Sequence, residues 1–308
     1  MRKGIVIGCI LFALAIAAVA WLSLGSREKS TSSPIGVRDA NHAQSTPSRK
    51  LLPQIADITD TGLHWEMRIQ AVRDLPENLG ASSTEKLFAF LKTPPASGEK
   101  DWYLVANEVM EVLRKKNLVA GIYTDRVLEL ILTRTADPMI RDYAAQHLAH
   151  WISGMDPLAC EGDEKKATDA FNKLCSVASA PENQSQTLCG TTLNALADVV
   201  LNGKVTFQKE KQPVASLALA VIQSENASSV NRSTAIQVAA KLNAPELPQL
   251  CRELASSENV PGDVKLSSVA ALGLVGDSSD IPFLKQFTSD GALQFAASAA
   301  VARLLKLN

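Results

Sequence analysis

From about residue 53 onward, apolar residues recur at the spacing of one face of an α-helix. Short segments that contain proline, such as 93–95, 136–138 and 180–182, separate the periodic stretches. The nearest approach to a strand pattern is 204–207, which is short. The pattern therefore predicts an all-α domain over residues 51–308. Two clear helical faces are Trp102, Val105, Val109, Val112 and Leu113, and Ile140, Ala144, His147, Leu148 and Trp151.

The C-terminal part of the chain contains the same unit twice. Val238 is followed ten residues later by Pro248, and Leu272 is followed ten residues later by Pro282, so the copies are offset by 34 residues (272 − 238). A helical pattern with a period of this size is typical of stacked helix pairs. The central apolar residue of each first helix gives a mean spacing of about 38 residues, which also fits two-helix repeats. These central residues are Leu75, Leu113, Leu148, Leu196, Val238, Leu272 and Val301.

The segment Ala270-Ala271-Leu272-Gly273-Leu274-Val275-Gly276-Asp277, followed by Ile281-Pro282-Phe283-Leu284, resembles the HEAT repeat in its short bacterial form. The resemblance is strongest over 228–305 and weaker over 137–150 and 53–135. It implies an armadillo-type fold, a right-handed α-α superhelix (an α-solenoid), with about six helical hairpins and a closing helix at 292–307. It also implies a binding or scaffolding role. Some members of the family are lyases or hydroxylases, and their functional residues have no match here.

An uncharged run over residues 4–25 follows Arg2 and Lys3. Its 22 residues (4 to 25) give a helix of roughly 33 Å, enough to cross a bilayer core of about 30 Å. The preceding cations favour an N-terminus on the cytoplasmic side. Residues 1–25 are therefore predicted to be one transmembrane signal anchor in a bacterial inner membrane. Residues 26–50, rich in Ser, Thr and Pro, are predicted to be a flexible linker to an extracytoplasmic, periplasmic domain.

Two alternatives for the N-terminus stay open. Ala18-Val19-Ala20 fits a signal-peptide cleavage site, and cleavage after Ala20 would release a secreted periplasmic subunit. Val6-Ile7-Gly8-Cys9 resembles a lipobox, although the apolar stretch here follows the cysteine instead of preceding it. All three interpretations place the residues beyond 50 outside the cytoplasm.

The charge distribution argues against a nucleic-acid partner. The chain has a formal net charge of −1, and residues 1–50 contain seven Lys/Arg and two Asp/Glu. The remainder therefore has 24 Lys/Arg (31 − 7) and 30 Asp/Glu (32 − 2), a balance of −6. Binding to a phosphate backbone needs clustered cations, which a mildly acidic domain does not supply.

Candidate chemistry is sparse. His147 and His150 are spaced to share a metal ion, but a zinc site needs a third ligand. Because His147 falls on the apolar face, it is predicted to be a packed histidine. The acidic segment 160–164 is predicted to contain a helix start at Asp163 rather than a cation site. Three matches to the glycosylation acceptor pattern, at Asn183, Asn226 and Asn231, are interpreted as chance.

The cysteines leave a disulfide open. Cys175 and Cys189 lie at similar distances from the turn at 181–182, so they can face each other in an antiparallel hairpin and are candidates for a disulfide. The alternatives are that both are buried free thiols, or that Cys160 pairs with either of them.

The sequence thus predicts a membrane-tethered, extracytoplasmic HEAT-repeat scaffold that mediates protein–protein interaction and is not an enzyme. No catalytic, cofactor-binding or metal-binding residue is predicted. The alternatives are a repeat enzyme of the lyase or metal-dependent modifying type, which would use His147 and His150, and the cleaved periplasmic subunit.

Overall fold

The computed structural model describes residues 52–95, 100–116, 120–154, 163–203 and 205–306. Throughout these residues the regular structure is helical, with no β-strand, as the apolar spacing predicts. The proposed anchor over 1–25 and the linker over 26–50 lie outside the described residues. The α-helices are α2 (Pro53–Thr59), α3 (Trp65–Arg73), α4 (Ala81–Lys92), α5 (Lys100–Lys115), α6 (Ala120–Leu132), α7 (Pro138–Gly154), α8 (Asp163–Ser179), α9 (Thr187–Asn202), α10 (Lys211–Gln223), α11 (Ser229–Lys241), α12 (Leu247–Ser256), α13 (Gly262–Val275), α14 (Ile281–Lys285) and α15 (Gln294–Lys306). Three short 3₁₀ helices, η1 (Pro181–Asn183), η2 (Val205–Glu210) and η3 (Ser278–Asp280), precede α9, α10 and α14.

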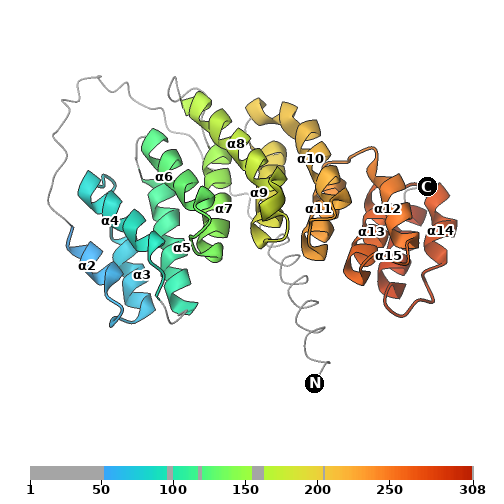
Figure 1. Cartoon of the computed structure of the whole chain (residues 1–308), viewed down its shortest axis with the longest axis horizontal. Helices are drawn as coiled ribbons and strands as arrows, with labels where there is room; N and C mark the ends of the chain where they lie inside the picture. The colour runs from blue at the N-terminus through green and yellow to red at the C-terminus, as the bar shows by residue number, and fades with distance from the viewer. Residues whose placement is uncertain (1–51, 96–99, 117–119, 155–162, 204, 307–308) are drawn as a thin grey trace. The chain divides into compact units, whose positions relative to one another are not determined.

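The odd-numbered helices from α3 to α15 form one row, in which each helix packs on the next odd-numbered helix (Figure 1). Contacts between even-numbered helices are thinner and include α6 with α8 and α8 with α10. This order is consistent with an α-solenoid-like fold. The central residues that set the predicted period, from Leu113 to Val301, all lie in the odd row, and Leu75 follows the end of α3.

The grouping of helices into pairs differs from the prediction. Each even-numbered helix from α4 to α14 packs more extensively on the odd-numbered helix that follows it than on the one before. The helix predicted to close the array alone, α15, therefore pairs with α14. A sequence period fixes the length of a repeat but not the helix at which each unit begins, which explains the difference.

Three arginines link successive helices in the same way. Each stands at the fourth position of an odd-numbered helix and donates from Nε to a carbonyl oxygen ten residues earlier, in the last turn of the preceding helix. There the cation satisfies an otherwise unpaired carbonyl and faces the negative end of the helix dipole. This repeated contact extends to the N-terminal helices, and the apolar spacing of the sequence gives no sign of it. The three pairs are Arg68 with Ile58 (3.0 Å), Arg141 with Ile131 (2.9 Å) and Arg232 with Ile222 (2.8 Å).

Helix starts follow their sequence signals. Pro248 and Pro282 lie in the first turns of α12 and α14, where proline loses no helical hydrogen bond. Asp137 Oδ1 accepts from the Met139 backbone N–H at 2.9 Å at the start of α7. The described part of α8 begins at Asp163, and the residues before it lie outside the described range. Among the described residues, none of the helices combines the length and apolar character needed to cross a bilayer.

Candidate functional site

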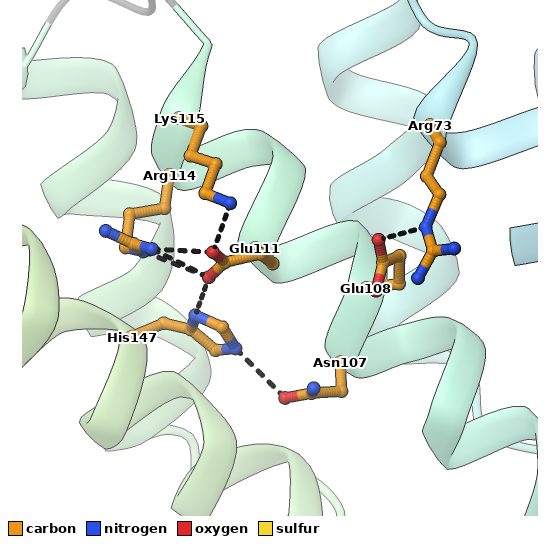
Figure 2. Close-up of polar contacts among 7 residues, drawn as sticks. All are labelled: Arg73, Asn107, Glu108, Glu111, Arg114, Lys115 and His147. Atoms are coloured by element: carbon orange, nitrogen blue, oxygen red, sulfur yellow. Dashed lines mark hydrogen bonds and ion pairs between the residues drawn. The ribbon is translucent and has the colours of Figure 1, made fainter. Parts of the chain in front are cut away.

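Polar side chains on α5 connect it to the helices on both sides (Figure 2). On one side, Arg73 of α3 donates from Nε to Glu108 Oε1 at 2.8 Å. On the other, Nε2 of His147 on α7 lies 3.0 Å from Asn107 Oδ1. The next contact along the row is between Asp142 Oδ2 and the Thr187 hydroxyl of α9, at 2.7 Å. Titratable groups therefore gather between helices α3, α5, α7 and α9.

Glu111 is the centre of this cluster. Its carboxylate accepts from Arg114 at 2.7 Å and contacts Lys115 Nζ at 2.8 Å, both on the same helix (Figure 2). Partial burial alone would raise the pKa of Glu111, but the hydrogen bonds and charges of the two cations outweigh burial and hold the pKa at about 2. The carboxylate is thus ionised and committed to neighbours on its own helix.

His147 is a packed side chain, as predicted, with 6% of its surface exposed. Burial lowers its pKa to about 4, although the nearby Glu111 charge acts in the opposite direction. The imidazole is therefore neutral near pH 7, and its Nε2 shares a hydrogen bond with Asn107 Oδ1. Nδ1 lies 3.5 Å from Glu111 Oε2 without a hydrogen bond. This arrangement joins two helices and presents no open histidine to a substrate.

His150, the other histidine of the metal hypothesis, is exposed on the outside of α7. Its ring stands nearly perpendicular to that of His147, with 6.3 Å between centroids. Within the part of the chain that the structure describes, no group of three or more His, Cys, Asp or Glu side chains is arranged to hold a metal ion. Among the described residues, His147 and His150 therefore have no third side chain with which to bind a metal ion.

The thiols of Cys175, Cys189 and Cys251 are free in the structure. Cys189 Sγ donates to the Ala178 carbonyl oxygen at 3.3 Å across the α8–α9 turn. Burial raises the pKa of Cys189 to about 11, which keeps the thiol protonated. The Cys175–Cys189 disulfide is not formed here and stays a prediction. Cys160 lies outside the described residues.

Two of the glycosylation-pattern asparagines are buried structural residues. Asn183 donates from Nδ2 to the Val177 carbonyl oxygen at 2.9 Å, which closes the end of α8. Asn231 donates to the carbonyl oxygens of Gln184 at 2.6 Å and Gln186 at 2.7 Å. Asn231 thereby ties α11 to the start of α9. Neither role could be read from the sequence. Asn183 bonds across an irregular turn, and Asn231 bonds to residues more than 40 positions earlier in the chain.

A groove of ≈ 390 Å³ lies between α13 and α15. Its floor consists mostly of alanine and glycine, and Leu274 on its wall is 50% exposed. Arg303 and Lys306 supply positive charge at one end, and neither has an ion-pair partner among the described residues. The lining residues are Ala270, Gly273, Leu274, Ala296, Ala299, Ala300, Ala302, Arg303 and Lys306.

Other odd-numbered helices also expose a large apolar side chain. Isolated apolar residues on a surface are ordinary, but here one recurs in the N-terminal half of α5, α7, α11 and α13. Four helices of the row therefore carry an apolar contact point on their solvent side. These residues are Leu104, Met139, Val230 and Leu266.

Comparison of the chain with protein-family models and with curated proteins finds no match. The candidate sites are therefore identified from the structure alone. They are a closed polar cluster between α5 and α7 and an open groove between α13 and α15.

The buried His147 predicts how stability responds to acid. Because its folded pKa of about 4 lies below the ordinary value of 6.5, the unfolded chain binds the proton more readily, and stability falls as the pH falls through this window. The loss should be on the order of 2 kcal/mol between about pH 7 and pH 5. In His147→Gln, which keeps a donor toward Asn107, this part of the pH dependence should disappear in urea unfolding curves.

The matched control is His150→Gln, at the exposed neighbour on the same helix, in which the loss of stability caused by His147 should persist. Equal profiles for wild type and His147→Gln would show that His147 is not desolvated as described.

Proposed function

We propose that this chain is a non-enzymatic scaffold that binds a protein partner through its row of odd-numbered helices. In this proposal the helices form an α-solenoid of the HEAT type. Residues 4–25 anchor it in a bacterial inner membrane, and the helical domain lies outside the cytoplasm. The apolar run and the linker composition of the sequence support the anchor and its orientation.

The HEAT assignment is supported by repetition at two levels. The 34-residue register of the C-terminal helices (272 − 238) is a sequence repeat. The arginines at the fourth positions of α3, α7 and α11 add a contact repeated in the N-terminal half. Helix pairs that stack in chain order bury their apolar sides on neighbours and leave one continuous face of the row open.

The observation that carries the binding role is the groove between α13 and α15. Its small residues allow a protein backbone to approach closely. The exposed side chain of Leu274 is unfavourable in water and offers an apolar contact to a partner. Arg303 and Lys306 would favour a segment that carries carboxylates. A helix or an extended segment of a partner protein fits these features.

No specific observation favours the enzyme alternative. His147 is buried, neutral and hydrogen-bonded to Asn107, which supports a structural role. The cleaved form differs from the anchored one only in residues outside the described range.

The test is proximity labelling in intact cells, with the labelling enzyme fused to the full chain. We expect a reproducible partner whose labelling falls at least about tenfold in Leu274→Glu, because a charge would then be buried at the interface. The matched control is Leu132→Glu, since Leu132 is equally exposed, at 50%, but lies on the even-numbered helix α6, outside the row. A neighbour list indistinguishable from that of a fusion with residues 1–50 alone would refute the scaffold proposal.

A further inference from the structure

The last helix of the row, α15, exposes an apolar stripe along its length. Its buried face, with Ala297, Ala300 and Leu304, packs chiefly on α13 and α14. The opposite face carries Phe295, which is 84% exposed, and Leu305, which is 59% exposed. Large apolar residues exposed together on one face of a helix are unfavourable in water and indicate an interaction surface.

The positions of the stripe indicate what covers it. Phe295, Ser298, Ala302 and Leu305 follow the spacing i, i+3, i+7, i+10, which is the seam of a two-helix coiled coil. The stripe is symmetric about residue 300, with a large residue at each end and two small residues between. Ser298 and Ala302 are both exposed. Such a stripe is complementary to an antiparallel copy of itself.

We infer that two copies of this chain associate through their α15 helices, packed antiparallel about a twofold axis near residue 300. Phe295 of one copy then lies on Leu305 of the partner subunit, and Ser298 lies on Ala302 of the partner subunit. The two small central layers let the helices approach closely. Each interface residue is used twice, as an isologous contact requires.

Charge complementarity supports the antiparallel direction. The helix α15 is preceded by Asp290 and ends with Arg303 and Lys306. In the antiparallel pair, Lys306 of one copy approaches Gln294 and Asp290 at the start of the other copy's helix. Helix dipoles also oppose each other favourably in this direction. A parallel pair would instead place the cations of both copies side by side.

This interface lies beside the proposed binding groove and shares Ala302 with it, whereas Phe295, Ser298 and Leu305 do not line the groove. A seam of four layers is small beside the roughly 1,600 Å² of a standard stable interface, so the dimer should be reversible. A covalent trap in the membrane is therefore the appropriate measurement.

The test uses two differently tagged full-length copies expressed together, one with Ser298→Cys and the other with Ala302→Cys. Mild oxidation of the membranes should give a mixed disulfide that carries both tags. Two copies of Ser298→Cys should cross-link poorly, because an offset of four residues separates their thiols by about 6 Å along the axis. Wild-type copies give the background from the native cysteines. Copies with Gln237→Cys, at an exposed site on α11, give the collision rate.

Adding Phe295→Glu to both copies should lower the mixed product at least about tenfold, because two carboxylates would enter the seam. Val230→Glu is the matched control, since Val230 is an apolar residue on α11 with 62% exposure. Thermal unfolding should be unchanged in both variants. A mixed product no larger than that of the Gln237→Cys copies, a larger product from Ser298→Cys alone, or an equal loss in Val230→Glu would overturn the dimer.

Discussion

Replacement of Asn231 by leucine is expected to destabilise the chain by about 3 kcal/mol or more, because it leaves several buried backbone groups without partners. The side chain of Asn231 is 1% exposed and makes three contacts with the N-terminal end of α9. Its Nδ2 donates to the carbonyl oxygens of Gln184 and Gln186, and its Oδ1 accepts from the Gly190 N–H at 3.2 Å. Leucine has a similar size but satisfies none of these groups.

The change should be visible by hydrogen exchange of the full chain. In a stacked array each helix pair is stabilised mainly by its neighbours, so amides of α9 and α11 should lose protection before those of α3 or α15. Asn226→Leu, in the exposed turn before α11, is the matched control and should shift stability by less than about 0.5 kcal/mol. Equal effects of the two substitutions would contradict the role of Asn231.

The helices could be predicted from the sequence because apolar spacing is a local property. The faces that contain Trp102 and Ile140 are buried as predicted, and so is His147. Proline placed the starts of α12 and α14 correctly. Each of these signals lies within one helix or one turn, where periodicity and helix-start chemistry decide the structure.

The contacts between helices could not be predicted, because they join residues whose relation depends on packing. In the sequence, nothing distinguishes Arg141 from the other arginines. Its role depends on the last turn of α6, where its guanidinium donates to the Ile131 carbonyl oxygen. Asn231 matched a modification pattern, yet it bonds to Gln184, 47 positions away. Likewise, Phe295 and Ala297 are both apolar residues of α15, and only the position of α13 separates an exposed residue from a buried one.

Close packing of α13 on α15 is expected to make Gly273 intolerant of any side chain. A Cβ atom at Gly273 would lie 2.6 Å from Ala300 Cα and 2.7 Å from Ala300 Cβ, so the two helices would have to move apart. Overpacking of this kind costs about 1–3 kcal/mol, and Gly273→Val should reach the upper end because valine is larger than alanine and its branched side chain loses χ1 freedom in a helix. Gly273→Ala should cost less, because alanine also recovers up to about 1 kcal/mol of helix propensity.

The same helix supplies the matched control at Gly262, where an added Cβ meets nothing within 4 Å. Gly262→Ala should be neutral or stabilising by up to about 1 kcal/mol, because alanine lowers the entropy of the unfolded chain. Thermal unfolding of the full chain should therefore rank Gly262→Ala at or above wild type and Gly273→Val lowest. Limited proteolysis of Gly273→Val should release α15 first, since that helix loses its main packing partner. A Gly273→Val chain as stable as wild type would show that α13 and α15 do not approach closely at this point. The groove between these helices and the exposed apolar stripe of α15 would then both be wrongly assigned.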